Sequence, residues 1–311
     1  MEIVLLVVGL LIGFVLIIKG GDWFVDAAVY FAKITGIPSF IIGATIVSLA
    51  TTLPEVLVSV LASRAGNVDL AIGNAYGSVI ANLGLILGIS LSISSPRIQG
   101  RGVLQKGIFM IGLTLLSLLL LRDLQMSGIE SIMLWAMLIF FLWLNILDVK
   151  TKEHEEDSEM SKDTKKQIIL FVLGALFVVV GAELLVSNAT TLAEILNVPQ
   201  AVIGLTIVAL GTSLPEFVTT IMSLIKKEAG LSIGNIIGAN VLNMSLAIPA
   251  SVLAANNLLV TRIETIQVDI PFSLWFMMIT IIPPMFYKRF FKWQGYLLLL
   301  SYAIYIIYTI I

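Results

Sequence analysis

The feature that most constrains the fold of this chain is a succession of ten apolar segments separated by polar stretches. They fall at about residues 3–18, 39–63, 71–95, 103–121, 127–147, 167–186, 200–225, 231–254, 267–287 and 293–311. Each segment can cross a hydrocarbon layer of about 30 Å as a helix, whereas the strands of a membrane barrel would be shorter and alternating. The 311 residues are 59% hydrophobic and only 12% charged, which excludes a pair of soluble domains. The sequence therefore predicts an all-α polytopic membrane protein with ten transmembrane helices.

The two groups of five segments repeat one another. The Leu-Pro-Glu motif that ends at Glu55 recurs at Glu216, 161 positions later, and the same offset relates Asn82 to Asn243. Because each repeat contains an odd number of spans, the second repeat must enter the membrane from the opposite side. Inverted repeats of this kind are a recurring architecture of secondary transporters, whose substrate site lies at the midplane between the halves.

A polar stretch divides the chain into three regions. We expect the first five-helix repeat at residues 1–148, an acidic linker at 149–166 and the inverted second repeat at 167–311. The first apolar segment follows Met1-Glu2 and lacks the positive charge of a secretory signal, so we expect it to be an uncleaved span. The linker contains no EF-hand spacing, so it is predicted to be a solvated connection rather than a calcium sensor.

Loop charges predict the orientation of the chain. With the N-terminus outside, most of the loop Lys and Arg side chains face the cytoplasm, and the outside loops keep only Arg64, Arg122 and Arg262. This skew is the positive-inside pattern. We therefore expect a multi-pass protein of the cell (plasma) membrane with both termini outside and the linker in the cytoplasm.

Two acidic residues, Glu55 and Glu216, lie deep within apolar segments, one in each repeat. Their distances from the nearest basic loop residues correspond to about half the thickness of the hydrocarbon core. A charged side chain at this depth costs at least about 3 kcal/mol, so it indicates a functional site. Pro54 and Pro215 precede the acids and, within a helix, would free backbone carbonyl groups beside them.

Polar side chains accompany both acids at helical spacing. The hydroxyl-bearing neighbours are Thr51 and Thr52 in the first repeat and Thr212 and Ser213 in the second. The next helix of each repeat carries a polar face, formed by Asn74, Ser78 and Asn82 and by their counterparts Asn235, Ala239 and Asn243. Gly73 with Gly77, and Gly234 with Gly238, are small-residue pairs that would let these helices approach their neighbours.

The ligand atoms gathered in this way are all oxygens. Carboxylates, hydroxyls, amides and carbonyls with a charge of −2 suit a hard cation such as Ca²⁺ or Na⁺. The chain has no Cys, and its one His, His154, falls in the linker, which excludes thiolate metal sites and His-dependent hydrolysis. A net charge of −2 without a basic face argues against nucleic acid as a partner.

The motifs Ala50-Thr-Thr-Leu-Pro-Glu55 and Gly211-Thr-Ser-Leu-Pro-Glu216 resemble the paired repeats of the calcium/cation antiporter superfamily. The segments Gly73-Asn-Ala-Tyr-Gly-Ser-Val-Ile-Ala-Asn82 and Gly234-Asn-Ile-Ile-Gly-Ala-Asn-Val-Leu-Asn243 carry the same resemblance. It is greatest to the short prokaryotic sodium/calcium exchangers and covers essentially the whole chain. The resemblance implies the sodium/calcium exchanger-like fold.

The resemblance also implies ligand roles. Glu55 and Glu216 would bind Ca²⁺, with the carbonyl groups of Thr51 and Thr212 completing the site. One sodium site would use Thr52, Ser78 and the Ser48 carbonyl group. Another, on the opposite side, would use Ser213, Thr212 and the Ala209 carbonyl group. Asn82 would line the centre.

Four positions depart from the pattern of the family. Ala50 and Thr52 replace Gly and Ser, which are mild changes. Ala239 stands where a second Ser is common, and this weakens the outer sodium site. Asn243 stands where sodium/calcium exchangers often have Asp, so a third carboxylate is absent and the counter-ion and stoichiometry stay open.

We therefore expect a secondary active antiporter, not an enzyme, that exchanges Ca²⁺ for Na⁺ by alternating access and functions as a monomer without a cofactor. The alternative is Ca²⁺/H⁺ exchange on the same scaffold, because two facing carboxylates repel each other and can share a proton. A passive cation channel could use the same ligands, but the inverted repeat with one midplane site argues against it. The expected partners are the lipid bilayer and inorganic cations.

Overall fold

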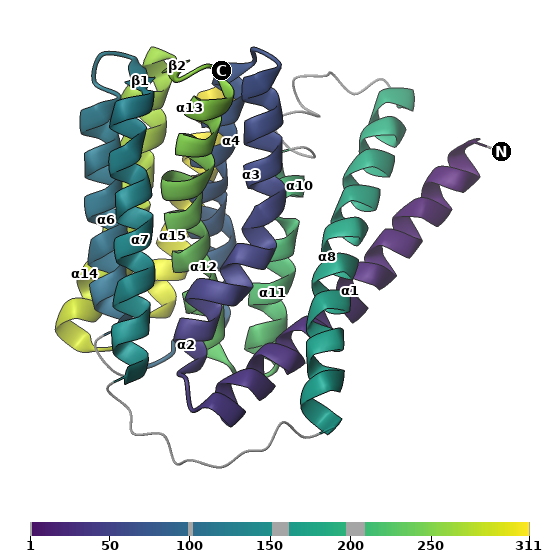
Figure 1. Ribbon diagram of the computed structural model, residues 1–311. Helices are drawn as coiled ribbons and strands as arrows, with labels where there is room; N and C mark the ends of the chain where they lie inside the picture. The colour runs from purple at the N-terminus through teal and green to yellow at the C-terminus, as the bar shows by residue number, and fades with distance from the viewer. Residues whose placement is uncertain (1, 99–101, 151–161, 197–208, 311) are drawn as a thin grey trace.

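A computed structural model describes residues 2–98, 102–150, 162–196 and 209–310 as a bundle of membrane-spanning helices (Figure 1). The first repeat contains α1 (Glu2–Thr35), α2 (Ser39–Ile42), the π-helix η1 (Gly43–Val47), α3 (Ser48–Arg64), α4 (Val68–Ile80), the π-helix η2 (Ala81–Leu87), α5 (Gly88–Ile93), α6 (Gly102–Leu120) and α7 (Gly128–Lys150). The second contains α8 (Lys162–Ile195), α10 (Ala209–Thr212), α11 (Leu214–Ile225), α12 (Ala229–Leu242), the π-helix η4 (Asn243–Ala247), α13 (Ile248–Ala254), the π-helix η5 (Thr265–Asp269), α14 (Ile270–Tyr287) and α15 (Lys292–Ile310).

These elements form the ten predicted spans, several of which consist of consecutive helices that run on from one another. Eight stretches of the described chain are long and apolar enough to cross a membrane. The other two spans are α15 and the pair α10 and α11, and the beginning of the span predicted at 200–225 lies outside the described residues. The fold class predicted from the sequence is confirmed.

The first helix of each repeat is longer than its apolar segment. Both α1 and α8 contain 34 residues, about 51 Å at 1.5 Å per residue, so each exceeds the thickness of the hydrocarbon core. The predicted segment at 3–18 ended before Lys19 and Asp22, but the helix continues through them. Charged residues end an apolar pattern without ending a helix, because Lys has good helix propensity.

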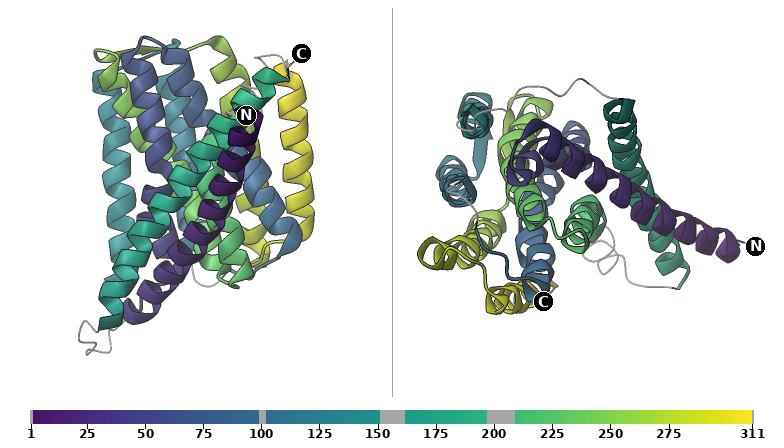
Figure 2. Two further views of the ribbon diagram at one scale, coloured as in Figure 1. Left: turned by 90° about the vertical axis from the view of Figure 1, so that its right-hand side faces the viewer. Right: turned by 90° about the horizontal axis from the view of Figure 1, so that it is seen from below.

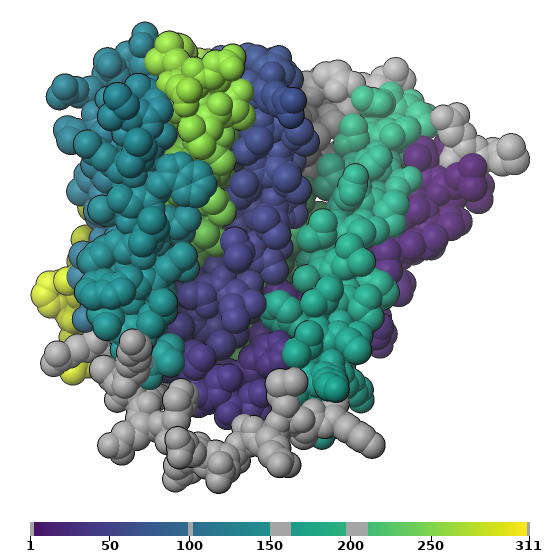
Figure 3. Space-filling view, in the orientation of Figure 1, coloured from purple at the N-terminus to yellow at the C-terminus, as the bar shows by residue number. Residues whose placement is uncertain are grey.

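Helices α1 and α8 lie side by side at one edge of the molecule (Figures 2 and 3). A Cβ atom at Gly13 would lie 2.9 Å from the Gly181 carbonyl oxygen, and one at Gly181 would lie 2.8 Å from that of Gly13. Gly20 and Gly174 face each other in the same way, at 2.8 Å in both directions. The offset of 161 converts one glycine pair into the other, which is the contact pattern expected of two antiparallel copies of one helix.

The polar helices of the two repeats form the centre of the molecule. In an 18-residue apolar stretch of each span, 72% of the residues are buried in Val68–Ile93 and 83% in Ala229–Ala254. The corresponding share in Ile3–Thr35 is 17%. The π-helices η2 and η4 begin at nearly equivalent positions of these spans, and they contain Asn82 and Asn243. Such π-turns are frequent at functional sites because they interrupt the regular hydrogen bonding of an α-helix.

A short antiparallel ribbon joins the repeats at one end of the bundle, where β1 (Gln125–Ser127) pairs with β2 (Leu258–Val260) and Met126 lies opposite Leu259. Met126 and Leu259 are fully buried and belong to the main apolar core. Apolar patterning does not indicate this ribbon, because the ribbon consists of only three residues on each side.

Candidate cation-binding site

The two repeats present their midplane acids on helices of different form. In the first repeat, α3 continues through Pro54, and Glu55 follows within the same helix. In the second repeat, α10 ends at Thr212 and α11 begins at Leu214, so Pro215 lies in a first helical turn, where its missing N–H costs little. The expectation of a proline within a helix is right for Pro54 and wrong for Pro215.

The side chains of Glu55 and Glu216 meet in the protein interior. Both are completely buried, and their carboxyl groups are close enough to interact with each other. Thr52 donates a hydrogen bond from Oγ1 to Oε1 of Glu216 at 3.1 Å, which links the two repeats. Both carboxyl oxygens of Glu55 and Oε2 of Glu216 have no hydrogen-bond partner among the described residues.

Amide side chains of α4 and α12 support the backbone around these acids. Asn74 donates to the Glu55 carbonyl oxygen at 3.1 Å and to Ser59 Oγ at 2.9 Å. The Thr51 hydroxyl lies 3.2 Å from Oδ1 of Asn235 and 3.3 Å from the Ser48 carbonyl oxygen, both of which can accept its proton. Helices α3, α4 and α12 therefore converge on the Glu55 region.

Most of the remaining predicted ligands are buried in the structure. Ser48, Ser78, Asn82, Ser213 and Asn243 are buried, and Thr212 is partly buried. Ala209 begins α10, and only its backbone is described. The hydroxyls of Ser78 and Ser213, Oδ1 of Asn82 and both amide atoms of Asn243 have no partner among the described residues.

Two residues that contact predicted ligands were not themselves singled out from the sequence. Asn235 was recognised only as part of a polar face, yet it contacts Thr51. Asn240, in α12, accepts a hydrogen bond from Nδ2 of Asn82 at 3.1 Å. Its counterpart in the first repeat is Val79, so a search for repeated polar residues passes over it. The available signal was three asparagines at 235, 240 and 243 within one apolar span.

The unpartnered atoms indicate what this site can hold. A buried polar group without a hydrogen bond is costly, so a concentration of such groups fits an ionic ligand. The described residues contain no cluster of three or more acidic, His or Cys side chains that could hold a metal, so neutral oxygens must complete any cation shell. Two carboxylates and surrounding neutral oxygens suit a divalent cation or monovalent cations as transported substrates.

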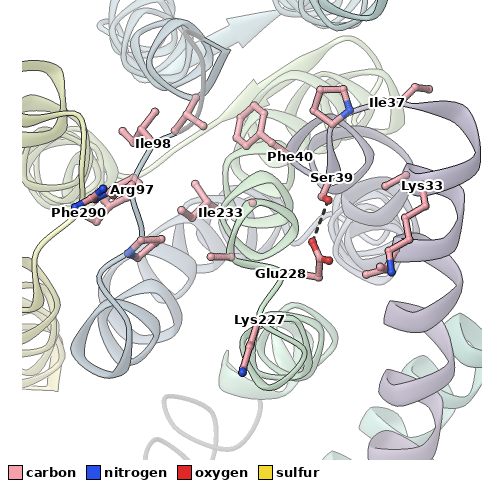
Figure 4. Close-up of a pocket in the computed structure, with 17 residues that line it drawn as sticks. Lys33, Ile37, Ser39, Phe40, Arg97, Ile98, Lys227, Glu228, Ile233 and Phe290 are labelled. Atoms are coloured by element: carbon pink, nitrogen blue, oxygen red, sulfur yellow. Dashed lines mark hydrogen bonds between the residues drawn. The ribbon is translucent and has the colours of Figure 1, made fainter. Parts of the chain in front are cut away.

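The cavity in Figure 4 lies elsewhere, among helix ends and loops. It has a volume of about 460 Å³ and is bordered by Lys33, Arg97 and Lys227, while Ser39 donates a hydrogen bond to Glu228 across it at 3.0 Å. None of the predicted cation ligands lines it. Cavity size alone therefore does not identify the candidate site.

The inverted helical repeats and the buried oxygen-lined centre define a multi-pass membrane protein of the cation-exchanging class. The chain matches the family described as sodium/calcium exchanger protein over residues 5–147 and 166–311. It therefore belongs to the sodium/calcium exchanger protein family.

Individual relatives agree with this assignment. The chain is 32% identical to an uncharacterized membrane protein of Methanocaldococcus jannaschii over 94% of each sequence. It is 29% identical to the sodium/calcium exchanger MaX1 of Methanosarcina acetivorans, over 78% of this chain and 81% of that protein. The solved structure of the sodium-calcium exchanger NCX_Mj soaked with 2.5 mM Na⁺ and 1 mM Sr²⁺ is similar with a TM-score of 0.85 and 30% identity, covering 96% of this chain and 97% of that one. The relatives named for an activity are transporters rather than enzymes.

Proposed function

We propose that this protein is a secondary active antiporter that exchanges Ca²⁺ for Na⁺ by alternating access at the site formed by Glu55 and Glu216. The observation that carries the proposal is the meeting of two fully buried acids from equivalent positions of inverted repeats, with three of their four carboxyl oxygens unpartnered among the described residues. Membership of the sodium/calcium exchanger family and the names of the relatives support the choice of ions.

Coupling follows from the charge of the site. Two carboxylates are neutralised by one Ca²⁺ or by two monovalent cations, and an additional uncompensated charge in a buried site is costly. Ca²⁺ and Na⁺ therefore compete for the same oxygens, and access to the site changes from one side of the membrane to the other with one kind of ion or the other bound. Competition of this kind converts a downhill Na⁺ flux into uphill Ca²⁺ extrusion.

The proposed ligand roles divide the neutral oxygens between the two ions. The carbonyl groups of Thr51 and Thr212 complete the Ca²⁺ shell, and Asn82 and Asn243 line its centre. Ser48, Thr52 and Ser78 supply one sodium site, whereas Ala209, Thr212 and Ser213 supply the other. The proposed setting is the plasma membrane, with both termini outside and the protein acting as a monomer.

Ca²⁺/H⁺ exchange is the second candidate. It is favoured by Asn243, which is a buried, uncharged amide and leaves the site with two carboxylates instead of three. Protons could then replace Na⁺ as the competing ions on the same pair of carboxylates.

The decisive experiment is radiocalcium uptake into proteoliposomes of the purified protein. An outward-directed Na⁺ gradient should drive Ca²⁺ uptake, and a pH gradient alone should not. Uptake driven only by the pH gradient would replace Na⁺ by H⁺ as the counter-ion. Rapid Ca²⁺ entry with neither ion on the opposite side would instead identify a passive channel.

A further inference from the structure

One buried contact between the two repeats has no equivalent at the positions related to it by the offset of 161. Asn82, in η2, donates a hydrogen bond from Nδ2 to Oδ1 of Asn240, in α12, at 3.1 Å. Both side chains are completely buried. The contact leaves Oδ1 of Asn82 and Nδ2 of Asn240 without partners among the described residues.

The repeat offset predicts what the equivalent contact would be. Asn243 is the counterpart of Asn82, and Val79 is the counterpart of Asn240. Val79 is buried but has no polar atom to offer, and both amide atoms of Asn243 lack a partner among the described residues. The two equivalent asparagines are thus held differently: Asn240 anchors the amide of Asn82, whereas no described residue anchors that of Asn243.

An anchored amide has a defined polarity. Because the amide nitrogen and oxygen lie on opposite sides of the terminal carbon, fixing Nδ2 of Asn82 on Asn240 turns Oδ1 of Asn82 away from that helix. Only the oxygen of an amide can bind a cation, since the NH₂ group is a donor. Asn82 is therefore presented as an oxygen ligand, whereas Asn243 can turn either end of its amide toward the centre.

We propose that Asn240 is a positioning residue that fixes the amide of Asn82 with its oxygen toward the transported cation. The proposal rests on the proposed two-glutamate site. Asn240 raises the affinity of that site for Ca²⁺ by preventing Asn82 from turning its NH₂ group inward. The contribution comes from one repeat only, so it makes the two sides of the site unequal.

The test is Ca²⁺ titration of the detergent-solubilised full-length protein by calorimetry, together with thermal unfolding of the same protein without Ca²⁺. Asn240→Val installs the residue of the first repeat, and Asn240→Thr has nearly the same shape but keeps an oxygen that can accept from Asn82. We expect Asn240→Val to raise the Kd for Ca²⁺ by about 3- to 10-fold, which is the range for one buried hydrogen bond. Asn240→Thr should recover part of this loss.

Transport separates positioning from a structural role. In proteoliposomes, Asn240→Val should raise the Ca²⁺ concentration for half-maximal exchange and leave the rate at saturating Ca²⁺ close to that of the unchanged protein. A lower melting temperature without Ca²⁺, combined with an unchanged Kd, would overturn the proposal. A Kd for Asn240→Thr that equals that of Asn240→Val would also overturn it, because the accepting oxygen would then be irrelevant.

A transplant provides a second route if Asn240→Val does not fold. Val79→Asn offers Asn243 the partner that Asn82 already has, and it should raise Ca²⁺ affinity as long as Asn240 is present. In the Val79→Asn variant, which keeps Asn240, removal of the Asn243 amide should cost more Ca²⁺ affinity than it does in the unchanged protein. An equal cost in both backgrounds would contradict the positioning role.

The outcomes distinguish this proposal from the one on which it rests. If Glu55→Gln leaves Ca²⁺ binding intact, the two-glutamate site itself is wrong. If Glu55→Gln abolishes binding and the Asn240 variants bind normally, the site stands and only the role of Asn240 is refuted.

Discussion

The two repeats carry equivalent polar residues at positions related by the offset of 161, but these residues form different hydrogen bonds. Thr52 donates to Glu216, while its counterpart Ser213 has a buried hydroxyl without a partner among the described residues. Thr51 bonds to Asn235, and Asn74, the counterpart of Asn235, contacts Glu55 and Ser59 instead. Duplication of a sequence therefore determines which polar side chains recur at equivalent positions, but it does not determine their hydrogen-bond partners.

The same difference appears in the backbone packing. A Cβ atom at Gly234 would collide with the Phe40 carbonyl oxygen, and one at Gly238 would lie 2.6 Å from that of Ala44. No atom of the described residues lies within 4 Å of a Cβ built at Gly73 or Gly77, and these glycines border a cavity of about 400 Å³. The helix interface at Gly234 and Gly238 is therefore tightly packed, whereas the equivalent interface at Gly73 and Gly77 is open. An alternating-access transporter requires this kind of inequality, because its two equivalent interfaces cannot be closed in the same way at the same time.

The largest expected effect comes from removing either acid. Glu55→Gln and Glu216→Gln should each lower Ca²⁺ exchange by at least about 100-fold, because one carboxylate cannot balance a divalent ion in a buried site. Radiocalcium uptake measures the effect, and Glu264→Gln, at an exposed acid, is the matched control. Loss in only one of the two variants would show that the repeats contribute unequally at their most similar position.

The hydroxyl beside each acid should have an unequal effect. Thr52→Val removes a hydrogen bond to a charged group, worth about 1.5–3 kcal/mol, so Ca²⁺ affinity should fall by about 10- to 100-fold. Ser213→Ala removes a hydroxyl with no partner among the described residues and should change Ca²⁺ affinity much less, while altering the dependence on Na⁺. Calorimetric titration compares the two variants, and equal losses of Ca²⁺ affinity would erase the proposed difference.

Glycine substitutions test the packing difference. Gly234→Ala should destabilise the protein by about 1–3 kcal/mol, because the methyl group overlaps the Phe40 carbonyl group. Gly73→Ala, at the equivalent position, should lower the melting temperature in detergent much less. A similar fall in both variants would mean that Gly73 is as closely packed as Gly234.

The smallest expected effect concerns the side-chain amide of Asn243. Asn243→Asp adds a third carboxylate where neither amide atom has a described partner, so folding should be retained and the Na⁺ dependence of exchange should shift by a few-fold. Asn82→Asp, by contrast, replaces the donor to Asn240 by an oxygen and should also reduce stability. Unaltered ion dependence of Asn243→Asp in proteoliposomes would show that the missing carboxylate does not set the counter-ion.

Repetition and apolar patterning were sufficient to predict the ten spans, and they singled out Glu55 and Glu216, whose side chains are completely buried. They failed where the repeats differ. Asn240 was overlooked because Val79 occupies its counterpart, and the break at Ser213 was missed because the same Leu-Pro-Glu motif continues as a helix in α3. Such differences arise from tertiary packing, which a local sequence pattern does not record.

The ends of helices were also less predictable than their centres. Asp22 follows the first apolar segment, and no sequence pattern indicates a partner for it. The structure pairs it with Lys226, whose Nζ lies 2.6 Å from Asp22 Oδ1 and 2.7 Å from Asp26 Oδ1. This contact joins α1 to the end of α11. Because Asp22 and Lys226 lie 204 positions apart in the sequence, no local sequence pattern indicates their contact.

The reciprocal glycine contacts between α1 and α8 have the geometry of a two-fold dimer interface. In such an interface, residue i of the first partner contacts residue j of the second, and residue j of the first contacts residue i of the second. In a single chain this means that each half carries a self-complementary surface of its own. Two separately synthesised halves, inserted in opposite directions, would therefore have the matching faces needed to find each other in the bilayer, and the covalent connection between them would serve mainly to fix their ratio and orientation.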